Sequence, residues 1–202
     1  MQLIGSKTSP FVRKVRVFMS EKEIDYEFKV DSPWEEGSTV PQHNPLGKIP
    51  ILLLPDATSV YDSSVIIEYL EANNTNKTLI PSGANERYKV LVWQALADGM
   101  ADAAATIFLE QKRPQSQQSQ EWINRQRGKI DLALLAASTQ LENKNWCHNQ
   151  ELTLADISVG CSLGYLDFRF AEIDWRSKYA NLADLSERLF KRPSFAQTVP
   201  QV

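Results

Sequence analysis

Along the first third of the chain, segments whose apolar residues have the spacing of strands alternate with segments whose apolar residues have the spacing of helices. Leu3-Ile4 and the alternating residues 26–30 are typical of strands. Between them, the segment after Ser9-Pro10 carries apolar residues at helical spacing. Serine is a favoured N-cap and proline a favoured first helical residue, so this pattern predicts a helix that begins at Pro10.

A second group of elements follows in the same part of the chain. Residues 32–44 are predicted to form a loop with at most a short helix. Residues 49–54 are apolar and predict a strand, and residues 58–61 predict a second one across a Pro-Asp-Ala turn. Asp62 then stands where it can cap the next helix. The predicted order is βαβ followed by ββα.

Beyond this region the pattern becomes helical throughout. Residues 73–83 are rich in Asn, Thr, Pro and Ser, which is the composition of a linker. Long amphipathic helices are predicted near residues 93–108 and 130–141, and a last helix near 182–190. Thr153 and Asp156 have the spacing of a capping box at the start of another helix. We therefore expect two domains, residues 1–75 and 84–202, of which the second is all-helical.

Composition and charge exclude several classes of function. The 202 residues carry a net charge of -3 and no cluster of basic residues, which argues against a nucleic-acid partner. We expect no membrane association and no signal peptide, because no apolar run is long enough. Cys147 and Cys161 lack a C-x-x-C spacing, and His43 and His148, expected at the surface, share no metal-ligand pattern. We expect no metal and a reducing, cytoplasmic location.

Four short segments, taken together, carry a resemblance to a known family. Residues 8–14 (TSPFVRK), 44–50 (NPLGKIP), 62–63 (DS) and 153–156 (TLAD) resemble the glutathione transferase superfamily in order and approximate spacing, with bacterial serine- and cysteine-type members most similar. The resemblance implies an α/β thioredoxin-like N-terminal domain (βαβ-ββα) before an all-α helical C-terminal domain. It also implies glutathione as co-substrate, no metal or nucleotide cofactor, a small electrophilic substrate between the domains, a homodimer and a role in detoxification.

Ser9 is the candidate catalytic residue that the resemblance selects. Glutaredoxins place the first cysteine of Cys-Pro-Tyr-Cys here, and this chain has Ser-Pro-Phe-Val instead. A serine hydroxyl can donate a hydrogen bond to the thiolate of glutathione, and the helix start adds a positive dipole end. Lowering a thiol pKa by two units from about 8.5 requires about 2.7 kcal/mol of preferential thiolate binding. Two alternatives stay open: Ser9 only caps its helix, or Thr8 holds the thiolate, as the alignment with some serine-type relatives selects.

The resemblance also assigns glutathione-binding residues around Pro50. It implies a cis peptide at Pro50 that turns the backbone of Ile49 toward the cysteinyl part of glutathione. Lys48 would meet the glycyl carboxylate, and Phe11 belongs to the glutathione-binding segment next to Ser9. Without the resemblance, Pro50 is a trans proline that opens an edge strand, and Lys48 is a solvated surface lysine.

The remaining assignments concern the γ-glutamyl part of glutathione. The resemblance implies that the backbone and hydroxyl of Ser63 bind its carboxylate while Asp62 faces its ammonium group. Asp98 resembles the acidic residue that some relatives extend across the subunit interface, although a solvated helical carboxylate explains it equally well.

The sequence thus predicts an enzyme that binds glutathione and activates its thiol for attack on an electrophile. Two other functions remain as alternatives. One is a non-catalytic scaffold that binds a macromolecular partner. The other is a glutathione-dependent reductase or lyase, which usually has cysteine where this chain has Ser9.

Overall fold

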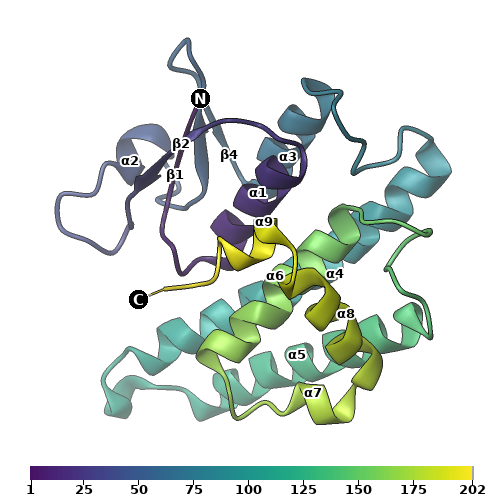
Figure 1. The fold of residues 1–202 in the computed structure, drawn as a ribbon. Coiled ribbons are helices and arrows are strands. Elements are labelled where there is room, and N and C mark those ends of the chain that lie inside the picture. Colours follow the sequence, from purple (N-terminus) through teal and green to yellow (C-terminus); the bar gives the residue numbers. More distant parts are fainter. Residues whose placement is uncertain (202) are drawn as a thin grey trace. The chain divides into compact units, whose positions relative to one another are not determined.

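The computed structural model describes residues 1–201, which form two compact units (Figure 1). The first unit contains Met1–Ile80 and the C-terminal segment that begins at Arg192, and the second contains Pro81–Lys191. The expected domain ranges, 1–75 and 84–202, place that C-terminal segment with the helical part instead. In the structure its short helix α9 (Pro193–Ala196) packs on the first helix of the chain.

A four-stranded mixed sheet organises the first unit, in the order β2-β1-β3-β4. The strands are β1 (Gln2–Gly5), β2 (Glu27–Val30), β3 (Ile51–Leu53) and β4 (Ser59–Tyr61). β1 runs parallel to β2 and antiparallel to β3, and β3 and β4 form an antiparallel hairpin. This arrangement confirms the predicted element order and the thioredoxin-like fold.

Three helices cover the two faces of this sheet, namely α1 (Pro10–Glu21), α2 (Val40–His43) and α3 (Ser63–Ala72). Ile4 and Ile51 are cross-strand partners that pack against Val40 of α2 in a buried cluster. Side chains alternate along a strand, so the buried Leu3 and Leu52 face the opposite side. Figure 1 shows α1 and α3 side by side, with α2 across the sheet from them.

Gly5 allows α1 to approach the end of β1 closely. A Cβ atom at this position would lie 2.5 Å from Cγ2 of Val12, well inside van der Waals contact. Val12 is itself fully buried in the first turns of α1. The absence of a side chain at Gly5 therefore fixes where the N-terminus of α1 sits above the sheet.

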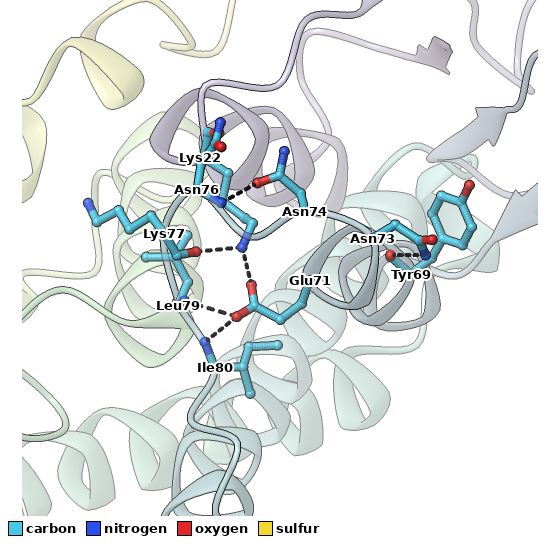
Figure 2. A network of polar contacts seen from close by, with 9 residues as sticks. All are labelled: Lys22, Tyr69, Glu71, Asn73, Asn74, Asn76, Lys77, Leu79 and Ile80. Atoms are coloured by element: carbon cyan, nitrogen blue, oxygen red, sulfur yellow. Dashed lines mark hydrogen bonds and ion pairs between the residues drawn. The ribbon is translucent and has the colours of Figure 1, made fainter.

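The C-terminal end of α1 is tied to two other segments of the same unit. The buried Lys22 ammonium donates to Glu71 Oε2 of α3 at 2.7 Å and to the Lys77 carbonyl (Figure 2). Glu71 Oε1 accepts from the backbone N–H groups of Leu79 and Ile80 at 3.1 and 3.2 Å. One oxygen of Glu71 thus binds the segment that leads out of the first unit, and the other binds Lys22, which also donates to that segment.

Glu21, the neighbour of Lys22, holds the C-terminal segment. It accepts two hydrogen bonds of 2.7 Å from the Arg192 guanidinium and one of 2.6 Å from the Ser194 hydroxyl. Lys77 pairs with it at 3.0 Å. Burial acts to raise the pKa of Glu21, but these hydrogen bonds and the Arg192 charge outweigh it and lower the pKa to about 2.

The second unit contains helices joined by loops and has no strand among its described residues. Its α-helices and 3-10 helix are α4 (Ala84–Gln111), η1 (Gln115–Gln117), α5 (Gln120–Leu141), α6 (Leu154–Arg169), α7 (Trp175–Lys178) and α8 (Ala180–Phe190). α4 packs against both α5 and α6, and nearly all of α6 is buried. The helices predicted near 93–108, 130–141 and 182–190 are confirmed. The short α7 and α9 were not predicted, because four residues are too few to display a helical period.

The start of α6 is closed by Asp156, as its capping-box spacing predicts. The Asp156 carboxylate accepts from the backbone N–H groups of Cys147 at 2.7 Å and Thr153 at 2.9 Å, and from the Thr153 hydroxyl at 3.0 Å. Burial raises the pKa of Asp156, although these bonds act in the opposite direction. His148 beside this loop is buried, with Nε2 3.0 Å from Glu86 Oε2, so its expected place at the surface is wrong.

Among residues 1–201, no helix is both long and apolar enough to cross a membrane.

Candidate functional site

The strand register brings the predicted site segments to one edge of the sheet. Ile51 lies opposite Ile4 on one side and opposite Tyr61 on the other. The residues that follow β1, precede β3 and follow β4 therefore emerge at the same edge. These are the segments that contain Ser9, Ile49-Pro50 and Asp62-Ser63.

Ser9 is the N-cap of α1 and is half-buried. Its Oγ accepts a hydrogen bond from the Val12 N–H at 3.3 Å, longer than the usual distance of about 2.9–3.0 Å. A hydroxyl that accepts this bond retains its own hydrogen as a donor. Ser9 can therefore cap α1 and donate to an external anion at the same time.

Thr8, the alternative to Ser9, has a different hydroxyl partner. Its Oγ1 lies 3.3 Å from the Oγ of Ser6, and either atom can be the donor. This contact ties Thr8 back into the loop after β1, whereas Ser9 points its hydroxyl to the start of the helix.

The first turn of α1 offers more than the Ser9 hydroxyl. Pro10 has no N–H, and Phe11, half-buried, contributes one of the early amide groups that have no partner within a helix. No acidic residue stands in this turn to neutralise the positive dipole end. The combination favours an anion.

Ile49-Pro50 is a cis peptide bond immediately before β3, as the resemblance implies. Pro50 is buried, Ile49 is half-buried and Lys48 is exposed. Sequence reasoning did not single out Asn44 as a site residue, but its buried side chain braces this loop. Its Nδ2 donates to the Lys48 carbonyl at 2.9 Å and its Oδ1 accepts from the Leu46 N–H at 3.0 Å.

The turn between Asn44 and Lys48 depends on Gly47. Gly47 has φ +61°, a left-handed conformation that favours glycine, and its N–H donates to the Asn44 carbonyl at 2.9 Å. Asn44 and Gly47 are therefore positioning residues for the Ile49 backbone. The signal that points to them is the Asn-Pro-Leu-Gly run in front of Lys48.

Asp62 caps α3 in an unusual backbone conformation. Its Oδ1 accepts from the Ser64 N–H at 2.8 Å, and its φ of 67° with ψ of 129° is a region that non-glycine residues rarely occupy. Strain of this kind, about 1–3 kcal/mol, is concentrated at functional sites. Ser63, the first residue of α3, is buried beside it, and the first turn of α3 contains no acidic residue.

A buried carboxylate, Asp31, shapes the loop after β2, and sequence reasoning missed it as well. It accepts from the Ser38 hydroxyl at 2.7 Å and from the Thr39 N–H and hydroxyl at 3.0 and 2.6 Å. Burial acts to raise the pKa of Asp31, but the bonds from Thr39 and Ser38 outweigh it and lower the pKa. β1 is parallel to β2, so this loop lies at the same edge as Ser9.

Asp98 lies apart from these residues in the chain. It belongs to α4 of the second unit, where it is half-buried. The residues that the sheet edge brings together thus come from the first unit alone: Ser9, Phe11, Lys48, Ile49, Pro50, Asp62 and Ser63.

Similarity to known proteins extends over nearly the whole chain. The family model for the glutathione S-transferase N-terminal domain matches residues 8–73, and the model for the C-terminal domain matches residues 120–188. The uncharacterized GST-like protein YibF of Escherichia coli (strain K12) is 39% identical over 200 residues, which cover 99% of this chain and 98% of that protein.

Two solved structures are similar over nearly the same length. A glutathione S-transferase from Methylobacterium radiotolerans, in complex with glutathione sulfonate, is 41% identical with a TM-score of 0.96, covering 100% of this chain and 95% of that one. Another, from Methylobacillus flagellatus with glutathione bound, is 43% identical with a TM-score of 0.96, covering 99% of each chain. Fold, domain matches and full-length identity together make this chain a member of the glutathione S-transferase family.

Proposed function

We propose that this chain binds glutathione at the sheet edge of the first unit and activates its thiol for attack on a small electrophile. The observation that carries the proposal is the Ser9 hydroxyl, which stands at the open start of α1. The Ile49-Pro50 cis peptide and the Asp62 cap emerge at the same sheet edge. Two relatives more than 40% identical hold glutathione or its sulfonate, which supports the same ligand here.

Each part of the tripeptide has a matching group in this arrangement. The Ser9 hydroxyl and the first turn of α1, including the Phe11 amide, stabilise the thiolate through a hydrogen bond and a dipole. The Ile49 backbone pairs with the cysteinyl backbone, and the exposed Lys48 meets the glycyl carboxylate. The start of α3, with Ser63 and Asp62, receives the γ-glutamyl carboxylate and ammonium group.

Calorimetric titration of the purified protein with glutathione tests binding. We expect millimolar or tighter affinity. A Lys48→Met variant should bind more weakly, because one carboxylate loses its counter-charge. Absence of binding at several times millimolar glutathione would contradict the proposed site as a whole.

Thiol activation is tested separately by the thiolate absorbance of bound glutathione against pH. Ser9→Ala removes one hydrogen bond to a charged group, about 1.5–3 kcal/mol, so the pKa of the bound thiol should rise about one to two units. Thr8→Ala is the matched control, since it removes the neighbouring hydroxyl. If only Thr8→Ala changes the pKa of the bound thiol, Thr8 donates the hydrogen bond to the thiolate. If neither variant does, the chain binds glutathione without activating it.

The finer assignments belong to the same proposal. We expect a homodimer in the cytoplasm with a role in detoxification, with residues 1–75 supplying the glutathione site and Asp98 reaching the γ-glutamyl group of the neighbouring subunit. Light scattering should give twice the chain mass of 22.9 kDa. A mass of one chain would remove the role of Asp98.

A further inference from the structure

The C-terminal segment of the chain contacts both ends of α1. Its helix α9 packs on α1 within the first unit (Figure 1). Arg192 and Ser194 bind Glu21 at the C-terminal end of α1. The residues that follow, Phe195 and Thr198, reach the first turns of the same helix. One short segment therefore adjoins both the anchored end of α1 and the end at which the thiolate is proposed to bind.

Arg13 receives this segment near the start of α1. It is 4% exposed, and its Nη2 donates to the Phe195 carbonyl at 3.3 Å. Its Nε donates a long hydrogen bond of 3.5 Å to Thr198 Oγ1, and its guanidinium carbon lies 5.5 Å from the centroid of the Phe195 ring. The backbone N–H of Arg13 donates to the Ser9 carbonyl at 3.0 Å. The residue that meets the C-terminal segment is thus bonded to the N-cap itself.

Thr198 orders the backbone that Arg13 contacts. Thr198 is buried, and its hydroxyl donates to the Ser194 carbonyl at 2.8 Å and lies 3.3 Å from the Phe195 carbonyl oxygen. Its backbone N–H also donates to the Phe195 carbonyl, at 3.2 Å. These bonds close the turn after α9, in which the Phe195 carbonyl faces Arg13.

Stability explains part of these contacts. Burial of the Phe195 ring and the bonds to a buried guanidinium hold the segment on the first unit. The contacts fall, however, on the part of α1 whose own N-cap is a single bond of 3.3 Å. Val12 lies against Gly5 of β1, and Arg13, the next residue, attaches the helix to the C-terminal segment. A helix start supported on two sides can keep a donor in the narrow geometry that a bound anion needs.

We propose that Phe195 and Thr198, acting through Arg13, are positioning residues that hold Ser9 and the start of α1 in place for the thiolate of glutathione. This inference rests on the proposed function. The C-terminal segment then contributes to thiol activation as well as to stability, although its residues touch neither the substrate nor the reacting sulfur.

Thr198→Val tests the proposal, because it removes the hydroxyl and keeps the branched shape. The pKa of the bound thiol, measured by thiolate absorbance against pH, should rise by about half a unit through partial loss of the helix-dipole interaction. Glutathione affinity, measured by calorimetry well below that pKa, should stay within twofold, because Lys48, Ile49 and Ser63 are assigned to the tripeptide on other segments. Thr198→Ser keeps the hydroxyl and should keep the wild-type pKa. An unchanged pKa in Thr198→Val would overturn the inference.

Ser194→Ala is the matched control. It also removes one hydroxyl from the C-terminal segment, but this hydroxyl bonds Glu21 at the other end of α1, at 2.6 Å. The urea midpoint should fall at least as far as in Thr198→Val, since a hydrogen bond to a carboxylate is stronger than one between neutral groups. The pKa of the bound thiol should not change. An equal rise of this pKa in both variants would mean that the segment only stabilises the unit, which would refute the positioning role.

Arg13→Met tests whether Thr198 acts through Arg13. The variant should raise the pKa of the bound thiol at least as far as Thr198→Val does, and the double variant should show no further rise. Additive rises would contradict the route through Arg13. Urea unfolding first shows whether Arg13→Met folds, and if it does not, the Thr198 and Ser194 variants decide the inference by themselves.

Ser9→Ala distinguishes failure of this inference from failure of the proposed function. If Ser9→Ala raises the pKa of the bound thiol and Thr198→Val does not, the C-terminal segment has no part in thiol activation and the proposed function stands. If the wild type does not bind glutathione, or if neither variant changes the pKa, the proposed thiol activation and the role of the C-terminal segment are both refuted.

Discussion

The N-cap of α1 is a single long hydrogen bond to the Ser9 hydroxyl, and one turn later the Arg13 guanidinium donates to the Phe195 carbonyl at 3.3 Å. At the last residues of α1, by contrast, Glu21 and Lys22 are the centre of a dense polar network. The N-terminal end has no acid in its first turn and leaves early amide groups without helical partners. The C-terminal end binds, through Lys22, the segment that leaves the first unit (Figure 2). Through Glu21 it also binds the C-terminal segment that returns to this unit.

The contrast indicates how a small helix can carry a ligand site. Polar groups that are to bind a ligand must stay unpaired within the protein, which weakens the element that presents them. A helix anchored firmly at the other end, and pressed onto the sheet at Gly5, can keep those groups in place. Substitutions at the C-terminal end of α1 should therefore change mainly the free energy of unfolding, and substitutions at its N-terminal end mainly the pKa of the bound thiol.

The largest expected effect is on stability, from Glu71→Ala. Removing the carboxylate leaves the buried Lys22 ammonium without its counter-charge and the Leu79 and Ile80 N–H groups without an acceptor. Breaking a buried pair in this way typically costs about 3–5 kcal/mol. Urea unfolding measures the loss.

The matched control for Glu71→Ala is Lys77→Ala. It removes a 42% exposed charge of the same network and should cost about 1 kcal/mol or less. Glutathione affinity should stay within twofold in both variants, measured well below their transitions. A large change in affinity would mean that the anchor and the site are not separable.

Glu21→Gln should produce a pH-dependent loss. The pKa of Glu21 is about 2 in the folded protein, below its ordinary value of 4.5, so its contribution to stability is full above pH 4.5 and disappears as the pH falls through 2. At pH 7 the variant should lose up to about 3 kcal/mol of unfolding free energy. Urea unfolding from pH 7 downward should show the two proteins converging; a constant difference would contradict the assigned pKa.

Gly5→Ala should disturb the open end without touching a polar group. The new Cβ would press on Val12, and overpacking of this kind costs about 1–3 kcal/mol. Because this displaces the start of α1 from the thiolate, the pKa of the thiol of bound glutathione should also rise. The double variant Gly5→Ala/Val12→Ala removes the two methyl groups that the new Cβ would contact, so the pKa of the bound thiol should return to its wild-type value. Gly128→Ala, where nothing lies within 4 Å, should not destabilise the protein.

The smallest expected effect on stability is that of Ser9→Ala. Loss of an N-cap typically costs about 1 kcal/mol, and the 3.3 Å bond here is long, so the loss in unfolding free energy should be at or below that figure. The same variant is expected to raise the pKa of the bound thiol by about one to two units. A large loss of unfolding free energy with an unchanged pKa of the bound thiol would mean that Ser9 is only a structural cap.

Local patterns sufficed for most elements of the fold. The strands, the cap at Asp62 and the capping box at Thr153 and Asp156 follow from periodicity and from side chains that bond their own backbone. The short α7 and α9 were beyond this reasoning, as was the packing of α9 on α1. A contact between residues about 170 positions apart, such as Glu21 with Arg192, leaves no trace in local sequence.

The site divides in the same way. Ser9, Lys48, Pro50 and Asp62 stand in recognisable segments, and their functional roles remain predictions. Asn44 and Asp31 were missed because each acts by bracing a loop, and a polar residue in a loop looks solvated until its neighbours are known.

The sequence by itself determined which elements form and which residue types stand at their ends, because capping, turn formation and hydrophobic period depend on neighbours along the chain. Only the tertiary structure decided at which helix N-termini the polar groups are satisfied within the protein and at which they stay available to a ligand. Ser9 and Thr153 are both predicted N-caps. Burial and the three hydrogen bonds that Asp156 accepts satisfy the polar groups at the start of α6, whereas Ser9 is half-exposed and caps α1 with one long bond. That difference depends on side chains brought together by packing, which no local pattern encodes.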